Sequence, residues 1–186
     1  VIGVDPVTAV VDKATAAVPD EVDNLTFETG DAYALRYEDA SFDIVHAHQV
    51  MQHLRDPIAA LREMRRVLRP GGVLAVRDAD YAGMVWAPES PALTNWMKIY
   101  QAMGAKLGVE PNAGRHLLGW TQEAGFDRIE PGASVWTYAT PDQRKFWAGT
   151  WAERAVASDF ATHAGEMDLA TTADLVEISD AWRRWE

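Results

Sequence analysis

Polar residues that could bind a ligand occur at the ends of short apolar segments with the pattern of β-strands. Asp5 ends the first segment, Asp31 lies just beyond the second, and His48 ends the third. The segments are residues 1–5, 25–28 and 42–48. In open parallel sheets, ligands bind at the carboxyl ends of the strands. We therefore expect these three side chains at one ligand-binding edge.

The chemistry available to these carboxylates is hydrogen bonding to a nucleoside. A carboxylate at Asp5 can accept hydrogen bonds from both hydroxyls of an adenosine ribose. A carboxylate at Asp31 can accept one from an exocyclic amino group such as adenine N6. Strand-end aspartates also commonly stabilise turns and cap helices, so each residue taken alone is weak evidence for a ligand.

The elements that position these residues alternate between strand and helix. Pro6 suits the first turn of a helix running to about Val18, and the Asp56-Pro57 pair suits the start of another. Pro70-Gly71-Gly72 is expected to end that second helix, and a fourth strand is expected from Val73. The alternation predicts an α/β fold in which the four strands are parallel neighbours in one sheet flanked by helices.

The second half of the chain is mainly helical and rich in tryptophan. It contains all eight tryptophans, which are Trp86, Trp96, Trp120, Trp136, Trp147, Trp151, Trp182 and Trp185. Helices are expected over residues 91–107 and 112–124 and from Thr140 and Thr171 onward, with a strand within 126–138. The simplest interpretation is a helical cover packed on the sheet, and a sharper one adds an apolar pocket for a small-molecule substrate under that cover.

A series of motifs in the first half resembles the class I methyltransferases of the ubiquinone/menaquinone-biosynthesis type, often labelled type 11. The motifs, in order, are Val1–Asp5, Gly30-Asp31-Ala32, Ser41–Val45, His53–Pro57 and Arg66–Gly72. The resemblance covers about residues 1–80. It implies a Rossmann-like fold, S-adenosylmethionine as cofactor, and methyl transfer by direct in-line displacement.

The resemblance also implies a set of cofactor-binding residues. Asp5 would bind the ribose, with Pro6 next to it; Asp31 and Ala32 would border the adenine; His48 and Gln49 would lie near the methionine end. Two features depart from the family pattern. The glycine-rich loop that follows the family's first strand is absent, and Leu35-Arg36-Tyr37 replaces a small "LPF" motif.

Candidate catalytic residues are few, because methyl transfer from a sulfonium needs little acid–base chemistry. The protein mainly aligns the reacting atoms and excludes water. A general base helps only if the acceptor must lose a proton. The candidates are His48, His53 and Tyr81, with His116 as a further possibility. Packing or capping also explains His53, and an ordinary core position explains Tyr81 or Trp86.

The composition limits the binding partners and the cellular location that we expect. The net charge of −11 disfavours nucleic acid, so we expect a small, partly apolar acceptor. The chain has no cysteine, which excludes disulfides and cysteine-based metal sites and suits a cytoplasmic location. No metal site or membrane span is expected, and the oligomeric state cannot be inferred.

Two other functions compete with methyl transfer. A catalytically inactive binding or regulatory module would keep the fold, and the missing glycine-rich loop favours it. A nicotinamide-dependent oxidoreductase would share a ribose-binding acid, but it leaves Asp31 and the segment 66–72 unexplained.

The domain organisation expected is a single domain over residues 1–186. Residues 1–80 would form its cofactor-binding part and residues 81–186 its acceptor side. We also expect truncation at both ends, because Val1 already lies inside a strand and the last helical pattern continues to Glu186.

Overall fold

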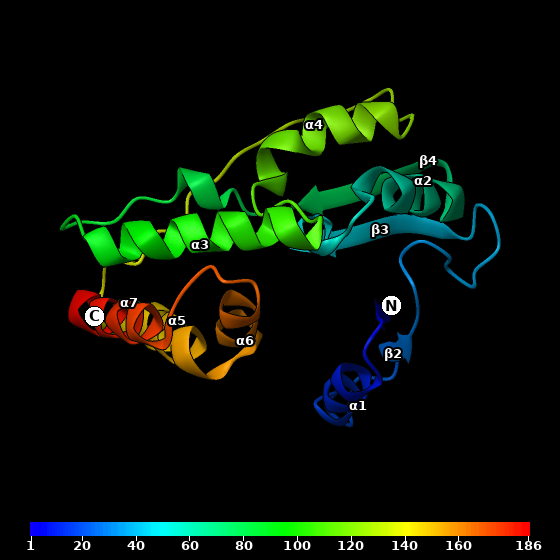
Figure 1. The fold of residues 1–186 in the computed structure, drawn as a ribbon. Helices are drawn as coiled ribbons and strands as arrows, with labels where there is room; N and C mark the ends of the chain where they lie inside the picture. Colours follow the sequence, from blue (N-terminus) through cyan, green and yellow to red (C-terminus); the bar gives the residue numbers. More distant parts are fainter. The chain divides into compact units, whose positions relative to one another are not determined.

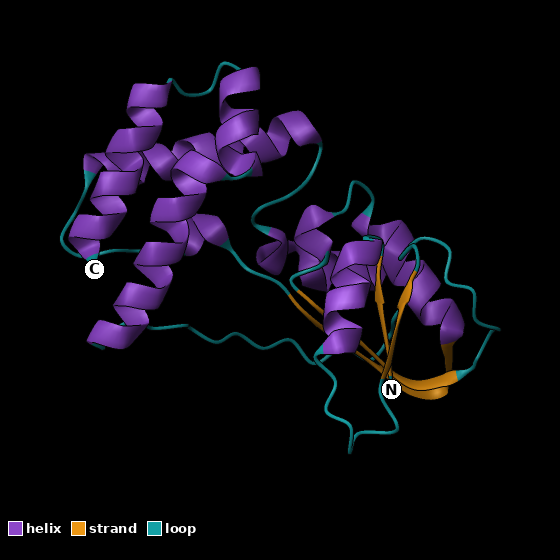
Figure 2. Ribbon diagram, turned by 90° about the horizontal axis from the view of Figure 1, so that it is seen from below, coloured by secondary structure: helices purple, strands orange, loops and turns teal.

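The computed structural model describes residues 1–186, which divide into two compact units. The strand unit comprises Val1–His48, Asp56–Arg77 and Leu117–Ile129; the helical unit comprises Gln49–Arg55, Asp78–His116 and Glu130–Glu186. All four strands belong to the strand unit (Figures 1 and 2). One division between the units, between Arg77 and Asp78, lies close to residue 80, where the cofactor-binding part is expected to end. That residues 1–186 form a single domain stays a prediction.

The strands of the strand unit pair in parallel, as predicted. Its elements are β1 (Ile2–Asp5), α1 (Thr8–Ala16), β2 (Thr26–Thr29), β3 (Phe42–His48), α2 (Pro57–Val67) and β4 (Leu68–Arg77). β1 pairs with β2 and β3 with β4, in two separate two-stranded sheets. The prediction of one sheet is therefore wrong, because no strand hydrogen-bonds to both β1 and β3.

The start of β4 also differs from the prediction. The helix α2 ends at Val67 and the strand begins at once with Leu68, so the Pro70-Gly71-Gly72 segment lies inside β4. The pairing register shifts there, because Leu68 pairs with Phe42 and Val73 with Ile44. The extra residues form a bulge, and Gly71 adopts a φ of 80°, which glycine tolerates best.

Helix α2 forms as its sequence predicts. The Asp56 carboxylate accepts a hydrogen bond from the Ala59 N–H, and Pro57 occupies the first turn. One face is buried through Ala60, Leu61, Met64 and Val67. On another side, Arg66 forms ion pairs with Glu63 and Asp39 at 2.7 Å each, which ties the loop before β3 to the helix.

The helical unit consists of short 3₁₀ turns and long helices. They are η1 (Met51–His53), η2 (Tyr81–Gly83), α3 (Pro91–Leu107), α5 (Pro141–Ala157), α6 (Asp159–Glu166) and α7 (Thr172–Trp185). Helix α4 (Ala113–Glu123) has residues in both units. The strand expected within 126–138 is absent. No strand lies alongside to supply hydrogen bonds, and Val135 is 88% exposed.

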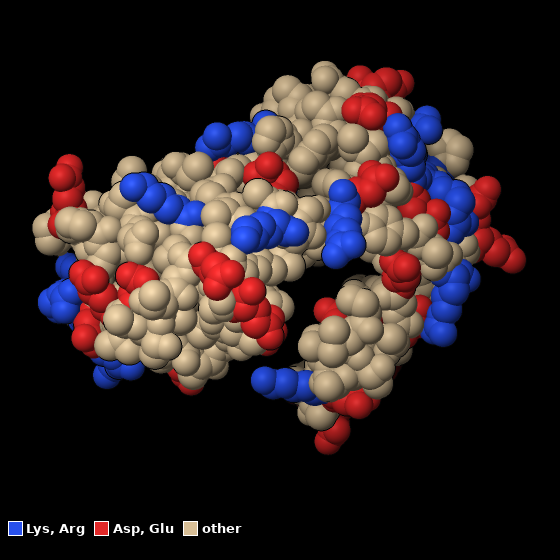
Figure 3. Space-filling model, viewed as in Figure 1, with Lys and Arg blue, Asp and Glu red and all other residues tan.

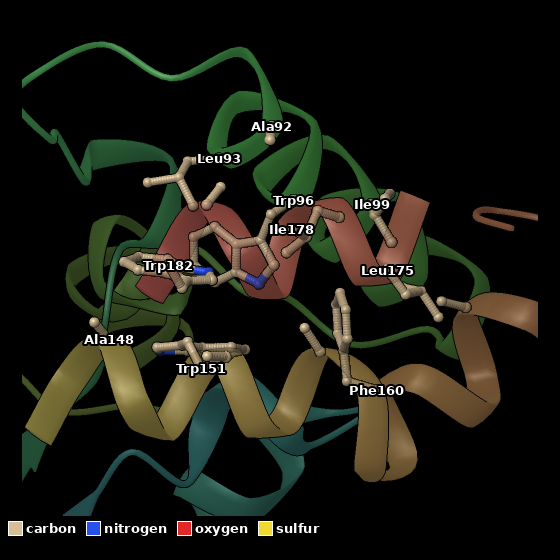
Figure 4. Packing of buried hydrophobic residues seen from close by; sticks show 14 of the residues in the cluster. Ala92, Leu93, Trp96, Ile99, Ala148, Trp151, Phe160, Leu175, Ile178 and Trp182 are labelled. Atoms are coloured by element: carbon tan, nitrogen blue, oxygen red, sulfur yellow. The ribbon is translucent and has the colours of Figure 1, made fainter. Parts of the chain in front are cut away.

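The core of the helical unit is aromatic (Figure 4). Trp96 on α3, Trp151 on α5 and Trp182 on α7 are buried against one another, with Trp96 ring centroids 4.6 Å from Trp151 and 5.0 Å from Trp182. Both pairs meet edge to face, the arrangement that aromatic quadrupoles favour. These tryptophans hold the helices of the unit together, so the helices need no sheet beneath them to bury their apolar faces.

The start of α7 gives a prediction about stability. The Thr171 hydroxyl accepts a hydrogen bond from the Asp174 N–H, and the Asp174 carboxylate accepts one from the Thr171 N–H. Thr171→Ala is expected to lower the free energy of unfolding by about 1 kcal/mol, measured by urea denaturation. Thr172→Ala, in the first turn and outside the cap, is the matched control and should leave stability nearly unchanged. Equal losses in both variants would contradict the capping role.

Candidate functional site

The carboxyl ends of β1 and β2 lie at one edge, as the sequence predicts. Asp5 pairs in register with Thr29, and the Gly30 N–H donates to the Asp5 carbonyl oxygen at 3.1 Å. Asp31 follows Gly30 directly, so both aspartates lie where these two strands end. An added Cβ at Gly30 would come within 2.7 Å of a Val4 methyl group, which explains a glycine at this close approach.

Each of these carboxylates stabilises its own turn through one oxygen. Asp5 Oδ1 accepts a hydrogen bond from the Val7 N–H at 2.8 Å, and Asp31 Oδ1 accepts one from the Tyr33 N–H at 2.9 Å. The turn-forming role is therefore real. It does not exclude ligand binding, because the second oxygen of each carboxylate remains available and Asp31 is exposed.

The end of β3 turns sharply at Gln49. This residue has a φ of 56°, a left-handed conformation that costs a residue with a Cβ roughly 1–2 kcal/mol. Such strain often occurs at functional sites. Gln49 directly follows His48, which is exposed and lies on the same side of the strand as His46 at a ring distance of 6.3 Å.

A polar cluster that the sequence analysis missed surrounds η1. Asp78 directly follows β4, and its two carboxylate oxygens accept hydrogen bonds from the Met51 and Gln52 N–H groups at 3.2 and 3.0 Å. The Gln52 amide nitrogen lies 3.2 Å from His53 Nε2. Asp78 carries the same signal as Asp5, an aspartate at the end of a strand, and that signal could have found it.

The electrostatics of this cluster follow from burial. Burial raises the pKa of Asp78, and the hydrogen bonds from the Gln52 and Met51 backbone oppose that rise. Burial lowers the pKa of His53, partly offset by the charge of Asp78. His53 is therefore biased toward its neutral form near neutral pH.

The remaining candidate bases lie in different surroundings. Tyr81 is buried in the aromatic core with its ring centroid 4.4 Å from that of Tyr100, and burial raises its pKa. His116 Nε2 lies 3.9 Å from a Glu110 carboxylate oxygen on the surface. The structure brings His53 and Asp78 together, whereas Tyr81 belongs to the core cluster. The catalytic roles of His48, His53 and Tyr81 stay predictions.

The helical unit also has an open surface hollow of about 470 Å³ beside Trp86. It is lined by Trp86, Glu89, Ser90, Pro91, Thr94 and Lys98. The Trp86 ring packs against the buried Trp96 with centroids 6.4 Å apart, which fixes the aromatic wall of the hollow. Its volume lies within the range of small-molecule sites, about 300–1,000 Å³, but the hollow is open to solvent. No group of His, Cys, Asp and Glu side chains that could hold a metal ion is present.

Comparison with known proteins identifies the family. A family model described as a methyltransferase domain matches residues 1–76. An uncharacterised methyltransferase of Schizosaccharomyces pombe is 33% identical over 195 aligned residues, covering 100% of this chain and 69% of the yeast protein. The chain belongs to the methyltransferases. S-adenosylmethionine is the methyl donor of this family, as the sequence resemblance implied.

Two further comparisons support the family and the fold. The ubiquinone/menaquinone biosynthesis C-methyltransferase UbiE of Bdellovibrio bacteriovorus is 40% identical over 73 residues, 39% of this chain and 30% of that protein. The solved [4+2]-cyclase SpnF has a TM-score of 0.53 and 22% identity, covering 99% of this chain and 61% of SpnF. The Rossmann-like α/β fold class is confirmed. The chain spans less than two thirds of the length of both proteins.

Proposed function

We propose that the protein transfers a methyl group from S-adenosylmethionine to a small, partly apolar acceptor by direct in-line displacement. The observation that carries this proposal is the pair of carboxylates, Asp5 and Asp31, at the shared edge of β1 and β2. When bound, the cofactor supplies an activated methyl group on a sulfonium. The protein then has to hold the reacting groups in line and keep water away.

The residues at this edge suit the adenosine half of the cofactor. Asp5 would accept hydrogen bonds from the ribose hydroxyls through the oxygen that its turn does not use. Asp31 would accept one from the adenine amino group in the same way. The half-buried Ala32 and the exposed Pro6 offer small apolar surfaces beside them. His48 and Gln49, at the strained end of β3, would lie toward the methionine end.

The acceptor is proposed to be a small molecule. The open hollow beside Trp86 is large enough to contact a small molecule, and Lys98 and Ser90 add polar groups to its wall. The net charge is −11, and basic side chains are mixed with acidic ones over the surface in view in Figure 3, which disfavours a phosphate backbone as partner. Every helix is too short or too polar to span a membrane. The absence of cysteine fits a cytoplasmic setting.

A second candidate is a protein that keeps the methyltransferase fold without methyl transfer. The structural similarity to SpnF supports this second candidate, because SpnF is named as a cyclase. One fold hosts many reactions, so a shared fold leaves the chemistry open.

The deciding experiment is a calorimetric titration with S-adenosylmethionine. It would use both the 186-residue chain and the product of the full open reading frame. The protein that binds would then be incubated with a deuterated methyl donor and a panel of small acceptors, and products detected by mass spectrometry. We expect binding and transfer of the labelled methyl group. A full-length product that does not bind the donor would refute the proposal, and binding without transfer to any acceptor would favour the second candidate.

Asp31 gives a first test of the cofactor site. Asp31→Asn keeps an oxygen for the Tyr33 N–H but removes the charge. We expect S-adenosylmethionine affinity to fall by about 1 kcal/mol, roughly fivefold, because the adenine also has apolar contacts. Asp23→Asn, an exposed position away from this edge, removes the same charge as a control. The measurement is the same titration, and equal effects in the two variants would contradict the assignment.

A further inference from the structure

The hollow beside Trp86 lies where the loop before α3 meets the first turns of that helix. Pro91, Thr94 and Lys98 line it from the helix, and their spacing of three and four residues places them on one face of α3. Trp86 and Glu89 line it from the loop. One hollow therefore combines an aromatic ring, a positive side chain and a negative side chain.

The part of the loop that carries Trp86 is held by contacts with two helices. Its ring packs edge to face against the buried Trp96 on α3, with centroids 6.4 Å apart. The carbonyl oxygen of the next residue, Ala87, accepts a hydrogen bond from the Trp185 indole N–H at 3.2 Å. The Arg144 guanidinium lies 4.6 Å from the centre of the Trp185 ring and holds that ring in turn. The aromatic wall is therefore formed before any ligand binds, which lowers the cost of binding.

The two charged side chains of the hollow have no partner within the protein. Lys98 and Glu89 form no ion pair or side-chain hydrogen bond, with each other or with any other residue. The helix rises about 10 Å from Pro91 to Lys98, so the two charges approach the hollow from opposite ends. The hydroxyls of Ser90 and Thr94 already take part in hydrogen bonds at the start of α3. Recognition of a ligand would therefore depend mainly on the two charges and the ring.

These charges select for a ligand that carries both signs. An anion attracted by Lys98 is repelled by Glu89 and by the net charge of −11, and a cation attracted by Glu89 is repelled by Lys98. A molecule with one carboxylate and one ammonium group can satisfy both side chains at once. A hydrocarbon part would cover the Trp86 ring, which is half-buried and apolar.

We propose that the hollow beside Trp86 binds a small zwitterion with an apolar body, of the amino-acid type. Its carboxylate pairs with Lys98, its ammonium group pairs with Glu89, and its hydrocarbon part lies against Trp86. This ligand chemistry follows from the hollow alone. That the zwitterion is the methyl acceptor rests on the proposed function.

The first test is a binding measurement that needs neither cofactor nor methyl transfer. The folded protein, as the 186-residue chain or the product of the full open reading frame, is titrated with L-phenylalanine. ¹H–¹⁵N NMR spectra follow the Trp86 indole N–H, assigned with Trp86→Phe. 2-Phenylethylamine and 3-phenylpropanoate keep the same hydrocarbon but lack the carboxylate or the ammonium group. We expect phenylalanine to shift the Trp86 signal and to bind about threefold more tightly than either analogue, since exposed ion pairs contribute little each. No shift at the solubility limit of phenylalanine, or equal affinity for all three compounds, would overturn the proposal.

Two charge variants then assign the pairs. Lys98→Met should abolish the preference for phenylalanine over 2-phenylethylamine, and Glu89→Gln should abolish the preference over 3-phenylpropanoate. Lys145→Met and Glu153→Gln remove the same charges from exposed positions on α5 outside the hollow, so they should change neither preference. If the two hollow variants keep both preferences, the zwitterion does not bind as proposed.

A separate experiment decides whether the zwitterion is the methyl acceptor. Amino acids are added to the acceptor panel of the labelled-donor screen. We expect a labelled zwitterion, and Lys98→Met should raise the KM for it about threefold at unchanged kcat, because the ion pair forms equally in the ground and transition states. Transfer only to uncharged molecules, with their KM unchanged in Lys98→Met, would overturn the acceptor assignment. If no methyl transfer is found at all, the proposed function fails, whereas the NMR titration still decides the ligand of the hollow.

Discussion

Replacing Asp5 with asparagine is expected to weaken S-adenosylmethionine binding by about 2 kcal/mol, roughly 30-fold. The Asp5 carboxylate lies at the end of β1 beside Gly30, with one oxygen bonded to the Val7 N–H. Asparagine keeps an oxygen for that turn, so the local backbone should survive. It lacks the charge that strengthens hydrogen bonds to two ribose hydroxyls. The measurement is a calorimetric titration with S-adenosylmethionine. It uses the form of the protein, the 186-residue chain or the longer product, whose wild-type version binds the cofactor.

Two further variants make this prediction decisive. Asp12→Asn removes the same charge from the exposed surface of α1 and should change affinity little. Asp5→Ala also removes the hydrogen bond to Val7, so it should bind no better than Asp5→Asn and be somewhat less stable. Unchanged affinity in Asp5→Asn would remove the main support for the cofactor site at this edge.

Replacing Trp96 with alanine should lower the free energy of unfolding by about 4 kcal/mol. Trp96 has no exposed surface and contacts the rings of Trp151 and Trp182 edge to face. Its Nε1 has no hydrogen-bond partner, so the loss comes from the cavity and the lost ring contacts rather than from a broken hydrogen bond. Small proteins are stable by about 5–15 kcal/mol, so this variant should lose much of its stability.

Urea denaturation followed by circular dichroism measures the effect. Trp96→Phe keeps an aromatic ring and removes the unpartnered N–H, so it should lose much less stability than the alanine variant. Phe146→Ala, which removes a ring 67% exposed on α5, should change stability by less than about 1 kcal/mol. A Trp96→Ala protein as stable as Phe146→Ala would show that the aromatic cluster does not hold the helices together.

The local elements were largely predictable from the sequence, because their signals are local. The segment 42–48 forms β3 with the predicted bounds, and Asp56-Pro57 begins α2. The helix predicted from Thr140 onward forms as α5, which a capping box between Thr140 and Gln143 opens. Each depends on residues within a few positions of one another, so the sequence contains all the interacting groups.

Errors arose where a distant partner decides the outcome. The segment 126–138 has strand-like residues, but a strand forms only when another strand supplies hydrogen bonds. The Pro70-Gly71-Gly72 segment was expected to end a helix, and pairing with β3 draws it into β4 as a bulge. Helix α6 was not predicted, although Ser158 caps it.

By itself, the sequence determined the parallel direction of the strand pairs, the meeting of Asp5 and Asp31 at one edge, and the family. Alternating strands and helices have few ways to connect, and parallel strands place their carboxyl ends together. Only the tertiary structure revealed that the Asp78 carboxylate accepts hydrogen bonds from the Met51 and Gln52 N–H groups, which lie 27 and 26 residues earlier in the chain. Hydrogen bonds across such separations depend on where folding brings the groups, and no local pattern records that position.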